Sequence, residues 1–227
     1  MENILNDHNY QKLLESYSSK YGENLDQVKS DAKLYLEELF TTQQPILLEV
    51  ATQISEYILN RGYDRTIDTD PEEIMSLAKI MRCHPVAFVM THKTYIDMMV
   101  LGVALARHGL PIPYIFSGIN MSFFGLGEIG RKSGVIFIRR SFKENHLYKL
   151  VLRFFISKLV DENKNFMWAI EGTRSRTGKI VWPKMGILKY IVEADAHSSN
   201  EVKYIPVSIV YDMIPDVELM VKEGRGS

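Results

Sequence analysis

The sequence predicts an α/β protein in which helices flank a mostly parallel or mixed central sheet, with an additional helical layer at the N-terminus. Two observations lead to this fold class. Apolar residues recur at helical spacing through about the first 80 residues, and from there short apolar runs alternate with amphipathic stretches. Such alternation is typical of strands joined by helical crossovers. We therefore expect an N-terminal helical region over residues 1–80 and an α/β domain over residues 81–227.

The composition is that of an ordinary globular chain. With 227 residues and a formal net charge of −1, a sizeable core is expected, and nucleic-acid binding through general positive charge is not. The one cysteine, Cys83, cannot form an internal disulfide, and we expect its thiol to be buried. The longest apolar run, 98–106, is about half as long as a membrane-spanning helix requires. Because no signal-peptide pattern is present either, we expect a cytoplasmic protein, at most peripheral on the cytoplasmic face of a membrane.

Three groups of apolar residues mark helices in the N-terminal region, the last of them ending at Gly62. A further helix should begin at Asp70-Pro71, where an acidic cap precedes a proline at the first helical position. None of these helices carries a catalytic signature, so we interpret the region as a structural bundle or a lid on the next domain. The apolar positions are Leu13, Leu14 and Tyr17; Leu34, Leu36, Leu39 and Phe40; and Ile46, Leu47, Val50, Ile54 and Ile58.

From Val86 onward, the pattern predicts strands and helices in alternation. The expected strands cover 86–90, 114–117, 135–139, 166–170 and 204–210. The expected helices cover 95–108, 123–132, 144–162 and 184–194. The helix over 144–162 has a broad apolar stripe, which favours a core-facing helix over one lying on a membrane.

His92 follows the first predicted strand, and Asp97 lies five residues later, in the first turn of the next helix. The turn between them can bring the carboxylate back to the imidazole, where it would fix the tautomer and make the other ring nitrogen more basic. This is the arrangement of a general base. The spacing by itself is common, however, and a surface histidine beside an unrelated carboxylate is the alternative.

A cationic, glycine-containing segment follows the fourth predicted strand, at 171–179. It places Arg174, Arg176 and Lys179 among two glycines and three hydroxyl residues, which favours a phosphate or another anion as ligand. A Walker A loop is excluded, because five residues separate Gly172 from Gly178 where that motif has four. A solvated surface loop is the alternative.

Further cations, Lys93 and Arg139-Arg140, lie at or just beyond the ends of other predicted strands. If the strands are parallel, these cations share the sheet edge that carries His92, so a base and an anion site would lie in one cleft. The GxGxxG pattern at 125–130 precedes a strand instead of following one, so we interpret its glycines as close-packing positions. No GxSxG, HExxH or paired-cysteine pattern is present, so we expect no metal site and no serine nucleophile.

Four ordered blocks together resemble the glycerol-3-phosphate acyltransferase family, which includes the bacterial enzyme and its dihydroxyacetone-phosphate relatives. His92-Lys-Thr-Tyr-Ile-Asp97 resembles the first motif of this HxxxxD superfamily, with Thr94 where serine is common. The similarity then runs through 118–120 with 134–142, through 170–179, and through 204–207. It covers about 84–216, and the N-terminal helices take no part in it.

The resemblance implies transfer of a fatty acyl chain from acyl-CoA or acyl carrier protein to the sn-1 hydroxyl of glycerol 3-phosphate, forming lysophosphatidate without any cofactor. It implies that His92 and Asp97 are catalytic. It also implies a set of residues that hold the substrate phosphate, and Lys93 is a plausible addition to them. By position, that set is Arg139, Glu171, Gly172, Arg174 and Arg176.

Several alternatives stay open at this point. The acceptor could instead be dihydroxyacetone phosphate or a lysophospholipid, although Ile170 stands where lysophosphatidate acyltransferases tend to carry proline. A non-catalytic binder of phosphorylated lipid is the alternative from another class. The bacterial relatives usually continue beyond the fourth motif, whereas this chain ends at 223–227, so we expect either a catalytic core or a truncated chain.

Overall fold

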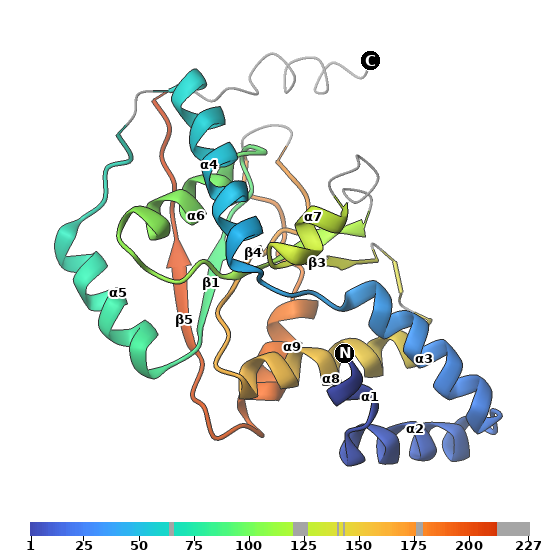
Figure 1. Cartoon of the computed structure of the whole chain (residues 1–227). Coiled ribbons are helices and arrows are strands. Elements are labelled where there is room, and N and C mark those ends of the chain that lie inside the picture. Colours follow the sequence, from blue (N-terminus) through green and yellow to red (C-terminus); the bar gives the residue numbers. More distant parts are fainter. Residues whose placement is uncertain (64–65, 120–126, 140, 143, 176–178, 213–227) are drawn as a thin grey trace, which may run out of the picture.

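A computed structural model describes residues 1–63, 66–119, 127–139, 141–142, 144–175 and 179–212. Its centre is a five-stranded sheet in the order β3-β2-β4-β1-β5, in which every pair of neighbouring strands is parallel (Figure 1). All carboxyl ends of the strands therefore lie along one edge. The strands are β1 (Val86–Met90), β2 (Tyr114–Gly118), β3 (Val135–Ile138), β4 (Phe166–Ala169) and β5 (Lys203–Val207).

Helices cover both faces of the sheet, as a parallel sheet requires. On one face, α8 (His146–Asp161) and α9 (Gly186–Asp195) pack in a core that includes Ala87 of β1. On the other face, α5 (Pro71–Cys83) and α6 (Asp97–Arg107) pack against Val86 and Phe88. Successive residues of a strand point to opposite faces, so an apolar run such as 86–90 can serve both cores.

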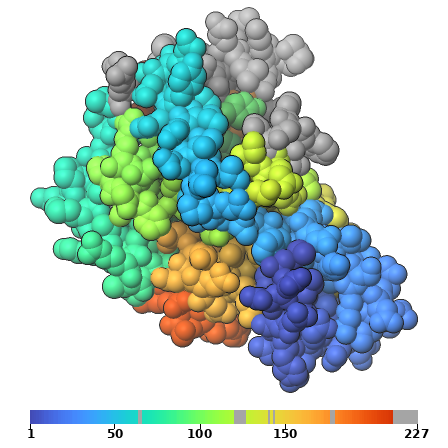
Figure 2. Space-filling view, in the orientation of Figure 1, coloured from blue at the N-terminus to red at the C-terminus, as the bar shows by residue number. Residues whose placement is uncertain are grey.

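The N-terminal helices are α1 (Glu2–Leu5), α2 (His8–Tyr21), α3 (Leu25–Leu39) and α4 (Pro45–Gly62). Side-chain caps fix two of their starts, because Asp7 and Asn24 each accept two backbone N–H bonds. Buried residues of α2 and α3 belong to the same core as α8. The next helix, α4, contacts α6 and lies across the surface, where Figure 2 shows it as the pale blue to cyan helix. None of the helices in the described part of the chain is long and apolar enough to cross a membrane.

The predicted strands and helices are present, with ends shifted by up to three residues in the described part of the chain. The strand expected over 204–210 is β5, which ends at Val207. The helix expected over 123–132 is represented by α7 (Gly127–Lys132), and its first four positions lie outside the described residues. Asp70 caps α5 through the backbone N–H groups of Glu72 and Glu73, as predicted.

The prediction of a buried thiol at Cys83 is wrong, because this residue is exposed. Cys83 is the last residue of α5 and does not belong to the buried strand that begins at Val86. The connection to β1 takes two more residues, His84 and Pro85, so the side chain remains on the surface.

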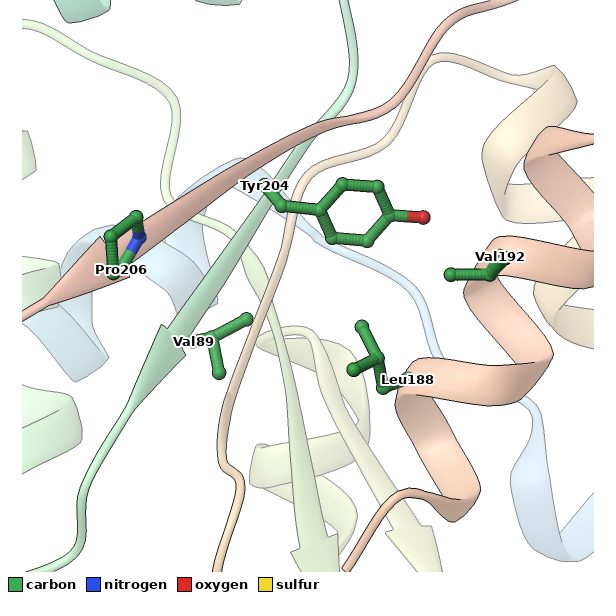
Figure 3. Close-up of a pocket in the computed structure, with 5 residues that line it drawn as sticks. All are labelled: Val89, Leu188, Val192, Tyr204 and Pro206. Carbon is green, nitrogen blue, oxygen red and sulfur yellow. The ribbon is translucent and has the colours of Figure 1, made fainter. Parts of the chain in front are cut away.

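An apolar groove of about 310 Å³ lies between the edge of the sheet and α9. Figure 3 shows Val89 of β1, Tyr204 and Pro206 of β5, and Leu188 and Val192 of α9 around it. Burial raises the pKa of the Tyr204 hydroxyl to about 12. The groove therefore offers apolar surface and no acid or base that would work near neutral pH.

Candidate active site

Two loops meet at the carboxyl edge of the sheet, one after β1 and one after β4. These strands are neighbours, so their loops leave the sheet side by side. Backbone bonds join them twice: Ile170 N–H donates to Met90 O at 2.9 Å, and Ser175 N–H donates to His92 O at 2.8 Å. The first and third sequence blocks thus form one structural unit.

His92 and Asp97 are in direct contact within this unit. Nδ1 of His92 lies 3.0 Å from Oδ2 of Asp97. The imidazole side chain is 21% exposed and the carboxylate only 2%, so the histidine faces the surface and the aspartate lies beneath it. A carboxylate at Nδ1 holds the proton there and leaves Nε2 as the nitrogen that can accept another.

Asp97 is held by three further hydrogen bonds. Its Oδ2 accepts the backbone N–H groups of Lys93 and Thr94 at 2.8 and 3.0 Å, and its Oδ1 accepts the hydroxyl of Tyr211 at 2.7 Å. Burial by itself would raise the pKa of Asp97. The bonds from His92, Thr94, Tyr211 and Lys93 together outweigh burial, so the pKa lies below its usual value. The carboxylate is therefore ionised at neutral pH and available to stabilise an imidazolium.

Glu171 links the same two loops through its side chain. It is 2% exposed, and its two oxygens accept different backbone groups: His92 N–H at 2.9 Å and Val181 N–H at 3.0 Å. In this geometry the carboxylate orders the backbone around the histidine. Gly172 follows with φ of 64°, a left-handed backbone conformation that favours glycine.

Arg174 is brought close to the histidine by Tyr95. The guanidinium carbon of Arg174 lies 4.8 Å from the centre of the Tyr95 ring, and the same ring meets the imidazole of His92 edge-on, with centres 6.5 Å apart. Tyr95 is 51% exposed, so this row of three side chains lies at the surface. The cation and the histidine thus contact the same tyrosine ring. Lys93, the residue after His92, is partly exposed.

Arg139 lies elsewhere on the same edge. Two strands separate β3 from β1, which places their backbones about 14 Å apart at the usual strand spacing. The guanidinium forms a bidentate ion pair with Glu38 of α3, with its closest contact at 2.7 Å, and lies against the rings of Tyr35 and Tyr148. Hydrogen bonding to Glu38 raises the pKa of Arg139. Arg139 therefore tethers the end of β3 to α3, a role that the sequence did not indicate. Its role in binding the substrate phosphate stays a prediction.

Replacing Arg139 with alanine is expected to lower the free energy of unfolding by about 1–2 kcal/mol, because Glu38 would keep a largely buried carboxylate without its partner. Thermal unfolding should show a fall in Tm of roughly 2–8 °C. Glu38→Ala should cost a similar amount, and the double variant less than the sum. An unchanged Tm in Arg139→Ala would contradict the tether, and a raised glycerol 3-phosphate KM in that variant alone would support a phosphate role.

Other predicted residues lie outside the described part of the chain, namely Arg176, Arg140 and the first glycine of the 125–130 pattern. Its last glycine, Gly130, packs in α7 so that a Cβ would lie 3.2 Å from the Phe137 ring, which confirms the close-packing interpretation at this one position. No group of three or more His, Cys, Asp or Glu among the described residues could hold a metal ion.

Sequence reasoning missed Tyr211, Tyr95 and Glu38. Tyr211 lies 114 residues from Asp97 along the chain and belongs to no recognisable spacing. Tyr95 lies inside the first block, but nothing in the sequence indicates that its ring would lie between an imidazole and a guanidinium. Glu38 lies in the helical region that we interpreted without a site.

Comparisons with known proteins find matches that include this region of the chain. The family model described as Acyltransferase matches residues 72–210, which include β1 to β5, His92 and Arg174. Relatives carrying the name "Putative acyltransferase plsB1" occur in Mycobacterium bovis and in the CDC 1551 and H37Rv strains of Mycobacterium tuberculosis. Each is 36% identical over 219 residues, or 96% of this chain. The chain spans 35% of the length of these curated relatives.

Proposed function

The chain belongs to the acyltransferase family, and on that premise we propose that it transfers a fatty acyl group from acyl-CoA or acyl carrier protein to the sn-1 hydroxyl of glycerol 3-phosphate. The observation that carries the proposal is the contact of His92 with a buried, ionised Asp97, with Arg174 held nearby across Tyr95. A base beside a cation suits an acceptor that has both a hydroxyl group and a phosphate.

The proposed reaction needs no acyl-enzyme. Nε2 of His92 accepts the proton of the acceptor hydroxyl while the hydroxyl oxygen attacks the thioester carbonyl carbon. The carbon–sulfur bond then breaks, and the imidazolium returns its proton to the leaving thiolate. Asp97 stabilises the imidazolium between these two steps. The products are an acyl ester and a free thiol.

The acceptor phosphate is proposed to bind to Arg174 and Lys93, with Arg176 and Gly172 as further contacts. The buried carboxylate of Glu171 accepts two backbone N–H groups, so its proposed contribution is to order this site. Positioning of this kind can supply several kcal/mol of the reduction in the activation barrier.

A non-catalytic binder of phosphorylated lipid is less well supported. Such a binder needs cations but has no use for a fixed histidine tautomer, whereas four donors here converge on Asp97 beneath His92. An incubation with labelled acyl-CoA or acyl carrier protein and a panel of phosphorylated acceptors tests the proposal. Glycerol 3-phosphate acylated at sn-1 is the expected product. Preferred acylation of dihydroxyacetone phosphate or a lysophospholipid would show that the acceptor is that compound and not glycerol 3-phosphate. Transfer to none of these acceptors would contradict the proposal that the protein is an enzyme.

Replacing Arg174 with alanine is expected to raise the KM for glycerol 3-phosphate by at least tenfold and to leave the KM for the acyl donor nearly unchanged, since of the two substrates only the acceptor is proposed to contact Arg174. Initial-rate kinetics with each substrate varied in turn measures both constants. Arg153→Ala is a matched control, because Arg153 also lies over a tyrosine ring, that of Tyr190, but on α8. Equal effects of Arg174→Ala on both KM values would count against the phosphate assignment.

A further inference from the structure

An exposed apolar loop lies beside the candidate active site, between β4 and α9. We call residues 179–185 the 179–185 loop, and every one of them is exposed. Trp182 is 90% exposed and Ile180 78%, with Val181 and Met185 at 43% and 54%. Large apolar side chains gathered at one place on a surface usually mark a contact with another molecule.

Cations accompany these apolar side chains. Lys179 and Lys184 lie toward the two ends of the loop and are exposed, and the loop contains no Asp or Glu. Since the whole chain has a net charge of −1, this positive charge is local. Tryptophan and lysine together suit the headgroup region of a bilayer, where the indole ring spans the apolar boundary and ammonium groups meet lipid phosphates. The complementary partner is therefore an anionic lipid surface.

The size of the loop favours a bilayer over a protein. A stable protein interface takes about 800 Å² and 20–30 residues from each partner, far more than seven residues supply. A fluid bilayer needs no complementary shape, and a few apolar side chains with neighbouring lysines give reversible binding.

Three hydrogen bonds fix the loop to the turn that carries the site. Val181 N–H donates to Glu171 Oε1 at 3.0 Å, Lys184 N–H donates to Ile170 O at 2.7 Å, and the Ser175 hydroxyl donates to Lys179 O at 2.7 Å. The other oxygen of Glu171 accepts His92 N–H. A lipid surface that contacts the loop would therefore lie next to His92, and the domain would not have to move to bring them together.

We propose that the 179–185 loop docks the protein on an anionic bilayer, with Ile180 and Trp182 entering the headgroup region and Lys179 and Lys184 contacting lipid phosphates. Docking would place His92 at the lipid surface, where an acylated product could leave directly into the bilayer. That benefit rests on the proposed function, but the docking itself concerns binding alone and can be measured without any substrate.

Trp182 provides the direct test. The chain has two tryptophans, and the other, Trp168, is only 3% exposed, so a change in emission reports on Trp182. Vesicles of equal parts phosphatidylglycerol and phosphatidylcholine should shift the emission to shorter wavelength and protect it from acrylamide. Vesicles of phosphatidylcholine alone should have a much smaller effect. Unchanged emission with anionic vesicles would overturn the proposal.

Paired variants locate the contact. Ile180→Asp should weaken co-sedimentation with the anionic vesicles about tenfold or more, because a charge replaces an inserted apolar side chain. Ile46→Asp on α4 is the matched control, since Ile46 has the same 78% exposure, and it should bind as the wild type does. Equal losses in both variants, or binding to acyl carrier protein and not to vesicles, would overturn the docking assignment. Acyl transfer between soluble substrates should survive in Ile180→Asp, and its absence in the wild type would count against the proposed function alone.

Discussion

Replacing His92 with glutamine is expected to lower kcat for acyl transfer by about 10²- to 10⁴-fold, the usual contribution of a general base. Glutamine keeps a polar side chain of similar size, but its amide cannot accept a proton from the acceptor hydroxyl. Because both loops keep their backbone bonds, Tm should stay within a few degrees of the wild-type value. Initial rates at saturating substrate and a thermal melt measure the two effects.

The matched control for this variant is His84→Gln. His84 also has a ring nitrogen in contact with an oxygen, 3.1 Å from the backbone carbonyl of Glu201, but it lies at the opposite end of β1. Its replacement should leave kcat unchanged. Near-normal turnover by His92→Gln would show that His92 takes no part in the chemical step, regardless of the result for His84→Gln.

Replacing Asp97 with asparagine is expected to lower kcat by about 10²- to 10⁴-fold as well, because a neutral amide neither fixes the Nδ1–H tautomer nor stabilises an imidazolium. The variant should also lose about 1–3 kcal/mol of stability, since the four donors around Asp97 would meet an amide in place of a carboxylate. Chemical denaturation at pH 7 measures that loss, and activity assays measure the first effect.

The pH dependence of this stability difference has a definite sign. The folded pKa of Asp97 lies below its unfolded value of about 3.9, so the ionised carboxylate stabilises the fold fully above that pH. The stability gap between wild type and Asp97→Asn should be present at pH 7 and should shrink as the pH falls through the folded pKa. A stability gap that grows on acidification would contradict the assignment.

Tyr211→Phe removes one of the four hydrogen-bond donors to Asp97 and should reduce kcat by no more than about tenfold.

The parallel sheet could be predicted because the alternation of apolar runs with amphipathic stretches is a local property of the chain. The order β3-β2-β4-β1-β5 could not, since it depends on where each crossover helix packs. The His92–Asp97 contact was predictable for the same local reason, as a five-residue turn brings the two side chains together. Cys83 shows the opposite case, because its exposure depends on where the last turn of α5 packs, which the local pattern does not indicate.

Long-range contacts mark the limit of what the sequence indicates at the site. Glu38 and Arg139 are 101 residues apart, and their ion pair exists because α3 packs beside the end of β3. The sequence indicated that Arg139 lies at a strand end and is a candidate phosphate ligand. It did not indicate that the carboxylate of Glu38 would form an ion pair with it. Tyr211 reaches Asp97 in the same way, from a segment beyond β5 that no spacing rule connects to the first block.

A quenched single turnover of wild type and His92→Gln, run side by side with labelled acyl donor and glycerol 3-phosphate, measures whether His92 acts as the general base. The wild type should convert the acceptor to the sn-1 acyl ester with matching release of thiol, and His92→Gln should form at most about a hundredth as much product in the same time. Equal product from the two proteins, or label bound covalently to the protein before any ester forms, would contradict this role of His92.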